Sequence, residues 1–420
     1  MKRKDEKPTI TTPSNALSRR QFAARAGAGI LSVSVLDSGV VRSYAANSRV
    51  RLGVIGCGGR GIWIAKHFAR HGGYEIVAGA DYFQDRVDDF GAQLQVPESR
   101  RFVGLAGYKR LLESGVDAVA IESPPYFHPE QAAAAVDAGK HVYLAKPVAV
   151  DVPGCQTISE ASRQATAKKL VFLVDFQTRA NAFYQEALKR VHEGALGELV
   201  FGESTYHADN PFEDKYQYLE ADPNNPENRL RAWGLDRVLS GDIITEQNIH
   251  ALDVQNWIMR QPPVSAVGTG GLKGRRKLGT CWDHFTVLFL YPNNLGITFS
   301  SRQFKGHGTR PGGIRNRMFG SKGVLETEYG GQVLIRGENF YRGGDTNRIY
   351  DEGAINNIAT FHNDITNSNY QNLTTEPSVQ SNLLTILGRT AAYERRPVTW
   401  DEMIKKAEPL LDPQLKGLSD

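Results

Sequence analysis

Short apolar runs alternate with helical patterns in the first half of the chain. Five runs between residues 49 and 176 have the apolar composition of buried strands: 50–55, 75–80, 117–121, 141–144 and 170–174. The segment 132–138, which follows His128-Pro129-Glu130 and precedes Gly139, is typical of a helix with proline in its first turn. Strands that alternate with helices predict an α/β domain with a doubly wound parallel sheet, here over residues 46–176.

The pattern changes after residue 181. We expect a helix over 183–192, a strand over 199–205, a structureless loop over 209–228 and a helix over 246–259. Alternating runs then predict a mostly antiparallel sheet from strands 264–268, 285–291, 296–300, 315–319 and 324–328. Two further helices, 355–366 and 379–393, close the chain, and we expect the second to pack on the first domain. The sequence therefore predicts a second, α+β domain over residues 177–398 and a C-terminal tail over 399–420.

The first 45 residues have the pattern of an export signal. The motif Ser-Arg-Arg-Gln-Phe at residues 18–22 precedes a small, weakly apolar stretch and the sequence Ser43-Tyr44-Ala45. This order is typical of a twin-arginine signal peptide, although an N-terminal segment that contains two arginines by chance is the alternative. Arg25 and Asp37 lie within the apolar stretch and disfavour a membrane span. We expect a periplasmic or secreted mature protein without a membrane anchor.

The export signal also accounts for the positive charge of the chain. The sequence has 50 basic and 46 acidic residues, but the balance beyond residue 45 is 42 to 43. This balance gives no indication of nucleic-acid binding. Cys57, Cys155 and Cys281 show no paired spacing, so neither a disulfide framework nor a zinc site is predicted.

A glycine-rich loop follows the first strand and opens a helical pattern at residues 62–71. In a dinucleotide site the first glycine of G-x-G-x-x-G permits a tight turn, the second admits the pyrophosphate and the third lets the helix pack on the strand. The alternative is a glycine-rich turn in an α/β protein without a cofactor. We interpret the first domain as a Rossmann domain whose loop residues contact a dinucleotide: Gly56, Cys57, Gly58, Gly59, Arg60 and Gly61.

Asp81 indicates which dinucleotide is bound. It ends the second strand, 20 residues after Gly61, where a carboxylate accepts hydrogen bonds from the adenosine ribose diol. The same charge would repel a 2′-phosphate, so we expect NAD rather than NADP.

Further contacts with the cofactor are expected at the carboxyl ends of later strands, where ligands bind in open α/β sheets. Ser123, Pro124 and His128 follow the strand 117–121, and Gln177 follows the strand 170–174. Arg179 also follows that strand and is a weaker candidate.

These motifs together resemble a known family. The sequence GVIGCGGRG at residues 53–61, Ser-Pro-Pro at 123–125, Ala-Lys-Pro at 145–147 and Gly-Asp at 241–242, followed by Glu246 and His250, resemble the Gfo/Idh/MocA oxidoreductases. That family includes glucose-fructose oxidoreductase and inositol dehydrogenase, and the resemblance extends from about residue 50 to residue 398. It implies a sugar or polyol substrate and a homo-oligomer formed through the exposed face of the second sheet.

The resemblance also implies three catalytic residues. The lysine of a Glu-Lys-Pro motif lies beside nicotinamide and substrate in that family and corresponds to Lys146, but Ala145 stands where the pattern has glutamate. A family helix with an aspartate and, four residues later, a histidine corresponds to Glu246 and His250, with glutamate in place of aspartate.

The residue types suit hydride chemistry. Glu246, His250 and Asp253 are spaced to share one face of the expected helix. A histidine with a pKa of about 6.5 accepts a proton from a sugar hydroxyl as hydride leaves the carbon. Glu246 would orient the imidazole or contact the substrate, and Lys146 would stabilise alkoxide character on the oxygen. For Asp253 a structural role is favoured.

Two sets of alternatives remain open for the side chains of this region. Glu246, His250 and Asp253 are also plausible metal ligands, but the resembled family uses nicotinamide alone, so we expect no metal. Aromatic and histidine side chains that follow the strand 199–205 would either contact a sugar or pack in the interior: Tyr206, His207, Tyr216 and Trp233.

Export constrains the reaction. The twin-arginine route carries folded proteins, and soluble NAD is scarce outside the cytoplasm, so we expect a tightly held cofactor that is regenerated within the site. The leading hypothesis is an NAD-dependent oxidoreductase that acts on a sugar, polyol or sugar derivative. The alternatives are a redox-neutral glycosidase or epimerase that forms a transient keto-sugar, and a binding protein that has lost the chemistry.

Overall fold

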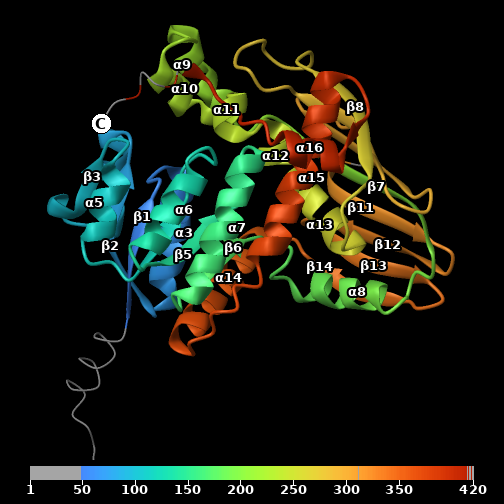
Figure 1. Cartoon of the computed structure of the whole chain (residues 1–420), viewed down its shortest axis with the longest axis horizontal. Helices are drawn as coiled ribbons and strands as arrows, with labels where there is room; N and C mark the ends of the chain where they lie inside the picture. Colours follow the sequence, from blue (N-terminus) through green and yellow to red (C-terminus); the bar gives the residue numbers. More distant parts are fainter. Residues whose placement is uncertain (1–48, 311, 414, 416–417, 419–420) are drawn as a thin grey trace, which may run out of the picture. The chain divides into compact units, whose positions relative to one another are not determined.

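The computed structural model describes residues 49–310, 312–413, 415 and 418. They form a six-stranded and a nine-stranded sheet (Figure 1). The predicted export signal lies outside the described residues. Within the described part of the chain, no helix is long and apolar enough to cross a membrane.

The first sheet is parallel throughout, with strand order β3-β2-β1-β4-β5-β6. This order confirms the doubly wound sheet. Its strands are β1 (Val50–Ile55), β2 (Tyr74–Asp81), β3 (Arg101–Val103), β4 (Ala118–Ile121), β5 (His141–Ala145) and β6 (Phe172–Asp175). The five expected strands are present, and β3 is an additional one of three residues without an apolar run of its own.

Alternation along β4 shows how helices cover both faces of this sheet. Ala118 and Ala120 pack toward α3 (Gly59–His71), α4 (Gln84–Leu94) and α14 (Ile349–Thr366). Val119 and Ile121 point to the opposite face, which is covered by α5 (Gly107–Glu113), α6 (His128–Asp137) and α7 (Val152–Ala167). Because both faces are covered, the strands are apolar at nearly every position.

The second sheet has the order β14-β13-β12-β11-β7-β10-β9-β8-β15. Its strands are β7 (Leu199–Ala208), β8 (Ser265–Gly271), β9 (His284–Leu290), β10 (Gly296–Gln303), β11 (Gly313–Gly320), β12 (Gly323–Glu328), β13 (Gln332–Gly337), β14 (Tyr341–Asp345) and β15 (Val398–Thr399). Neighbours are antiparallel except β7 and β10, which confirms a mostly antiparallel sheet. The strands β13, β14 and β15 were not expected.

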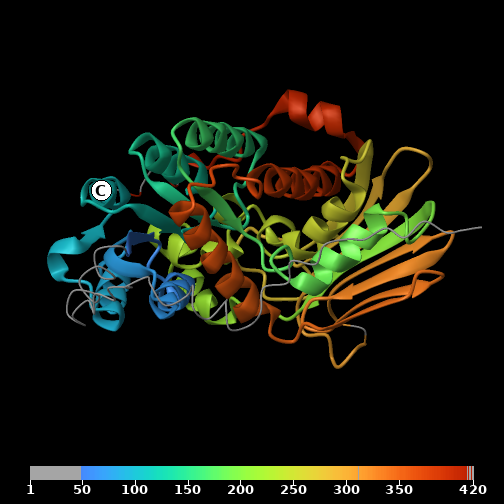
Figure 2. The same cartoon turned by 90° about the horizontal axis from the view of Figure 1, so that it is seen from below.

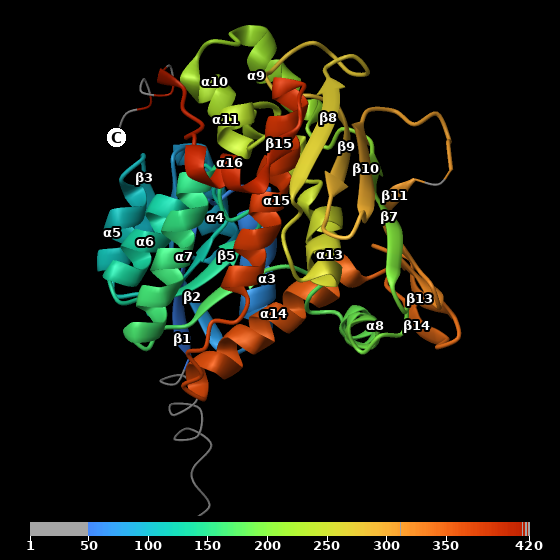
Figure 3. The ribbon, with the colours of Figure 1, turned by 45° about the vertical axis from the view of Figure 1, so that its right-hand side comes forward.

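Helices α8 (Ala182–His192), α13 (Ile249–Met259) and α15 (Thr375–Glu394) pack on one face of this sheet (Figures 2 and 3). On β7, Ser204 faces α13 and its hydroxyl donates to Gln255 Oε1 at 2.9 Å. Phe201 is three residues earlier on β7 and therefore points to the other face, where its ring stacks on Phe319 with centroids 4.3 Å apart.

The expected structureless loop over 209–228 is wrong. That segment contains the short helix η2 (Glu213–Lys215), helix α9 (Tyr216–Ala221) and the start of α10 (Pro226–Arg231), followed by η3 (Trp233–Leu235) and α11 (Arg237–Ser240). Asn225 caps α10 by accepting from the Glu227 and Asn228 amides, and Tyr216 and Leu219 are buried. The polar composition of the segment suggested a loop, but one of its polar residues caps a helix and its few apolar residues are buried together.

The single helix expected over 246–259 is also wrong. It is two helices, α12 (Ile243–Glu246) and α13, because the Asn248 amide donates to the Ile243 carbonyl five residues back and interrupts the regular ladder. Glu246 and His250 therefore do not share one helix face.

The C-terminal helices join the two sheets. As expected, α15 packs on the first domain: Asn382 Oδ1 accepts from the Ala149 amide, and Arg389 donates to the Val150 carbonyl. The earlier helix α14 also packs there, against α3 (Figure 3). After β15, residues that we expected as a tail form α16 (Trp400–Lys406).

Candidate functional site

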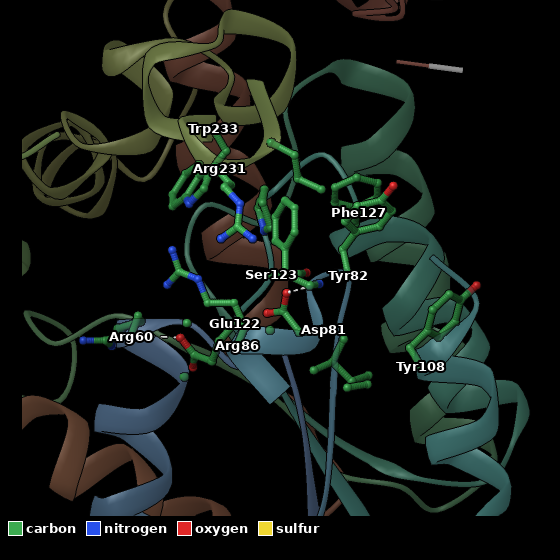
Figure 4. A pocket seen from close by; sticks show the side chains of 18 of the residues that line it. Arg60, Asp81, Tyr82, Arg86, Tyr108, Glu122, Ser123, Phe127, Arg231 and Trp233 are labelled. Carbon is green, nitrogen blue, oxygen red and sulfur yellow. Dashed lines mark hydrogen bonds and ion pairs between the residues drawn. The ribbon is translucent and has the colours of Figure 1, made fainter. Parts of the chain in front are cut away.

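A cavity of about 820 Å³ lies at the carboxyl ends of β1, β2 and β4 (Figure 4). One side is formed by the glycine loop, Asp81, Glu122, Ser123 and Pro124. The other side comes from the segment that was expected to be a loop and includes Phe212, Lys215, Leu230, Arg231 and Trp233.

The glycine loop fits the pyrophosphate of a dinucleotide. Gly56 has φ +94°, and a Cβ there would lie 2.5 Å from the backbone of Glu122 and Ser123. A Cβ on Gly61 would lie 1.9 Å from the Gly56 carbonyl oxygen, whereas one on Gly59 would meet no atom within 4 Å. Helix α3 begins at Gly59 without a side-chain cap or an acidic residue in its first turn. Its amide groups therefore remain available to an anion.

Asp81 is fixed by the loop that it faces. Its carboxylate accepts from the Cys57 amide at 2.7 Å and from the Phe83 amide at 3.0 Å. Burial raises the pKa of Asp81, and these two hydrogen bonds oppose that shift. Arg86 also lines the cavity, and its guanidinium lies 3.3 Å from the position of a Cβ on Gly58. The Asp81 carboxylate and the Arg86 guanidinium thus lie at the end of the cavity where an adenosine ribose would bind.

Three of the expected cofactor contacts lie behind the cavity surface. The Cys57 thiol is buried against the Val54 and Ala80 carbonyls. The His128 ring nitrogens lie 2.8 Å from the Pro147 carbonyl oxygen and 2.7 Å from that of Ser123. Burial lowers the pKa of His128 to about 4, so the neutral ring donates to one of the two carbonyls. Gln177 is 2% exposed, and its Oε1 has no hydrogen-bond partner among the described residues.

The three expected catalytic residues come together from separate segments. Lys146 Nζ lies 2.5 Å from the Glu246 backbone oxygen and 3.4 Å from its Oε1. The positive charge of Lys146 also acts on His250. None of the three belongs to the lining of the 820 Å³ cavity. The structure thus brings Lys146 from β5 together with residues of α12 and α13.

The His250 ring is largely buried and neutral. Burial, and then the charges of Lys146 and Arg60, lower its pKa well below the usual range, so the ring is neutral near pH 7. Its Nδ1 is buried without a hydrogen-bond partner among the described residues, as is Glu246 Oε2. Other such orphaned atoms in this part of the sequence are on Gln177, Thr178, Asn248, Gln303 and Tyr329. Buried polar atoms without protein partners leave hydrogen-bonding capacity for water or a ligand.

An ionic cluster at the cavity lining joins Arg60 to two buried carboxylates. Arg60 Nη2 donates to Asp175 Oδ2 at 2.7 Å, and its Nε lies 3.4 Å from Glu122 Oε2 (Figure 4). Both carboxylates have fully buried side chains. Burial raises the pKa of Glu122 to about 7, while Arg60 and Lys146 lower it and Asp175 raises it.

Asp253 has a structural role in an ion pair. Its carboxylate accepts from Arg179 Nε at 2.9 Å and from Ser381 Oγ at 2.7 Å, so its hydrogen-bonding capacity is used within the protein. No cluster of three or more His, Cys, Asp or Glu suited to a metal occurs in the described part of the chain.

The weaker aromatic candidates separate into two groups. Trp233 lines the cavity, and Tyr206 is close enough to Glu246 for that charge to raise its pKa after burial. Tyr216 is buried beside Arg275, and the His207 ring lies 3.1 Å from the Ser300 hydroxyl. The latter two are therefore packed within the second domain.

Sequence reasoning missed Glu122, Arg86, Arg231 and Asp175. Glu122 directly follows a predicted strand, as Asp81 does, and that position was a usable signal. Arg231 gave none, because it reaches the cavity only through the fold of α10, where it pairs with Asp85 at 2.8 Å.

Comparison with known proteins identifies two domains of one family. The oxidoreductase family GFO/IDH/MocA, NAD-binding Rossmann fold, matches residues 50–175. The GFO/IDH/MocA C-terminal domain matches residues 184–326. Together the two matched regions account for more than half of the chain.

Curated relatives match over part of their length. A glycosyl hydrolase family 109 protein of Shewanella pealeana is 30% identical over 162 residues, which cover 37% of this chain and 35% of that protein. Inositol 2-dehydrogenase 3 of Saccharopolyspora erythraea is 29% identical over 221 residues, which cover 52% and 56%. The chain thus spans from about a third to just over half of the length of these relatives.

Solved structures show the same fold. Aldose-aldose oxidoreductase from Caulobacter crescentus, complexed with glycerol, superposes with a TM-score of 0.66 at 19% identity, over 84% of this chain and 99% of that chain. At this identity the likeness extends to the fold alone.

Proposed function

The chain belongs to the GFO/IDH/MocA oxidoreductase family, and on that premise we propose that it transfers hydride between a tightly held NAD and a sugar, polyol or sugar derivative. The observation that carries this proposal is the meeting of Lys146, Glu246 and His250 beside the carboxyl edge of the Rossmann sheet. A neutral buried histidine beside a lysine is the pair that oxidation of a hydroxyl requires.

Each of these residues has a task in the proposed reaction. His250 takes the hydroxyl proton, and Lys146 stabilises negative charge on the same oxygen. Glu246 holds Lys146 through its backbone and side-chain oxygens. NAD supplies the hydride acceptor when it is bound. Orphaned atoms on Gln177 and Asn248 are available to hydrogen-bond the other hydroxyls of a polyol.

Three further properties belong to this proposal. The cofactor is NAD rather than NADP, because the Asp81 carboxylate occupies the ribose end of the cavity. The protein is exported with its cofactor by the twin-arginine route and acts in the periplasm or outside the cell. It forms a homo-oligomer through the sheet face that carries Phe201 and Phe319, of which Phe201 is 44% exposed.

A redox-neutral reaction is the second candidate. The match to a glycosyl hydrolase family 109 protein favours it. In such a reaction NAD would supply the hydride acceptor and the same residues would move the hydroxyl proton. A C–H next to the resulting ketone would become acidic, and elimination or epimerisation would precede hydride return. A binding protein without chemistry is the third candidate, since Ala145 and Glu246 depart from the family pattern.

One experiment separates the three candidates. The purified protein, without added NAD, is incubated with a panel of sugars, polyols and glycosides, and reduced-nicotinamide absorbance and glycoside cleavage are followed separately. We expect a sugar-dependent rise in absorbance that a second carbonyl compound reverses. Cleavage without net reduction would select the glycosidase, and exchange of a sugar C–H for deuterium in D2O without cleavage or reduction would select the epimerase. The absence of all three signals with every compound would select the binding protein.

A further inference from the structure

Two carboxylates flank Ala145 at the carboxyl edge of the first sheet. Ile121 of β4 is paired with Leu144 of β5, so the next residues, Glu122 and Ala145, are neighbours across the sheet. On the other side, Ala145 is paired with Asp175 of β6. The guanidinium of Arg60 forms an ion pair with each of the two carboxylates.

The two carboxylates differ in how many hydrogen bonds they already accept from the protein. Asp175 accepts from Arg60 through Oδ2 and from Asn357 Nδ2 through Oδ1, both at 2.7 Å. Neither oxygen of Glu122 has a hydrogen-bond partner among the described residues, although the side chain is fully buried and lines the cavity. The Arg60 guanidinium reaches Glu122 Oε2 only at 3.4 Å, so both oxygens of Glu122 keep acceptor positions for a hydrogen-bond donor on a ligand.

The strand order identifies the half of the cofactor that meets Glu122. In a 3-2-1-4-5-6 sheet a dinucleotide crosses the crevice between β1 and β4, with one mononucleotide on each half. Asp81 is on β2, in the adenosine half. Glu122 follows β4 and neighbours the strand that carries Lys146, so it belongs to the nicotinamide half.

We propose that Glu122 is a cofactor-binding residue: its carboxylate accepts a hydrogen bond from the nicotinamide half of NAD and supplies, from the neighbouring strand, the negative charge that Ala145 lacks. This inference rests on the proposed NAD function. The oxidised nicotinamide ring is cationic and the reduced ring is neutral, so a nearby carboxylate stabilises the oxidised form. Glu122 therefore lowers the reduction potential of the bound couple.

The test measures that potential on the protein as purified with its dinucleotide. Wild type and Glu122→Gln are equilibrated at pH 8 with dye couples of known potential, and the reduced-nicotinamide absorbance is recorded. We expect the variant to raise the potential by about 30 mV, which is a tenfold change in the ratio of NAD⁺ to NADH affinity. Glu75→Gln is the control, because Glu75 is on β2, is 49% exposed and pairs with Arg49; it should leave the potential unchanged.

A transposed carboxylate tests the position. The double variant Glu122→Ala, Ala145→Glu moves the charge to the adjacent strand and should return the potential to within about 10 mV of wild type, about a twofold change in the affinity ratio. An unchanged potential in Glu122→Gln overturns the proposal, and so does a double variant that stays at the raised value. If Glu122→Gln fails to fold, Glu122→Asp replaces it, because the shorter carboxylate is withdrawn from the cavity. It should raise the potential by a smaller amount, and no rise overturns the proposal.

The two proposals fail differently. A wild-type protein that neither carries nor binds a dinucleotide refutes the proposed function before any variant is compared. A wild type that carries one, with the same potential as Glu122→Gln, refutes only the role of Glu122.

Discussion

A carboxylate lies at each end of the cavity, and the two carboxylates have different hydrogen-bond partners. Asp81 accepts two backbone hydrogen bonds, from the Cys57 and Phe83 amides. Glu122 has no such donor and only the Arg60 guanidinium, at 3.4 Å. The adenosine end is therefore preorganised by its own loop, whereas the nicotinamide end is completed by charged side chains from distant segments and by the ligand.

This contrast predicts that variants at the nicotinamide end lose chemistry while keeping the cofactor. Lys146→Ala and His250→Ala should each lower kcat by about 100- to 10,000-fold, the usual contribution of a positioned proton acceptor or charge. Turnover and dinucleotide content are measured on the same preparations. Lys189→Ala, an exposed lysine of α8, is the control. Full turnover in both site variants would remove them as catalysts.

Variants at the adenosine end should lose binding first. Asp81→Ala removes acceptors for the ribose and for the two amides, and we expect about a 10- to 100-fold loss of NAD affinity. NADP should lose less, because Arg86 stays in the cavity and the repelling charge is gone. Binding of both cofactors is titrated for wild type and variant. An unchanged NAD-to-NADP ratio would show that Asp81 does not select the cofactor.

Two glycines of the loop separate binding from folding. Gly61→Ala places a Cβ 1.9 Å from the Gly56 carbonyl oxygen, so we expect a loss of about 1–3 kcal/mol in the free energy of unfolding. Gly59→Ala meets no protein atom within 4 Å and should fold normally, but it should weaken NAD binding about tenfold by crowding the phosphates. Thermal unfolding and NAD titration of both variants are the measurements. Equal behaviour of the two would contradict the assigned roles.

The smallest expected effect is a pH dependence of stability. Because the pKa of Glu122 is raised to about 7, the folded protein binds this proton more tightly than the unfolded chain does. The stabilisation is complete below about pH 4.5 and is lost as the pH rises through 7. Arg60, Lys146, Asp175 and Tyr143 face this carboxyl group.

Dinucleotide-free wild type should therefore lose about 1–3 kcal/mol relative to Glu122→Gln between pH 5 and pH 8. Urea unfolding of both proteins at the two pH values measures this difference. Parallel pH profiles would mean that Glu122 titrates normally.

The placement of Asp81 beside the glycine loop could be predicted from the sequence, because the contacts that create it are local. Gly56, Gly58, Gly61 and Asp81 belong to one strand-loop-helix-strand unit. Their contacts are made within this unit or with the adjacent strand. The five main strands of the first sheet were also predicted from their apolar runs. In such regions the pattern of apolar and polar residues is sufficient to predict the strands.

The nicotinamide end was predicted only in part, because it is built from contacts distant in sequence. Lys146 and Glu246 are 100 residues apart, and their meeting was expected from the family resemblance alone. The interruption of the helix at Asn248 separates Glu246 from the helix face of His250. The position of Glu122 beside Ala145 follows from the register of β4 and β5. No local pattern contains such information.

A dinucleotide held in this cavity as the hydride carrier is the central requirement of the proposed function. Protein purified from cells that express the full chain is denatured, and the supernatant is analysed by mass spectrometry against free NAD and NADP standards. We predict about one NAD per chain, with NADP at trace level. A supernatant without any dinucleotide, from protein that is folded and active on a sugar, would contradict the account.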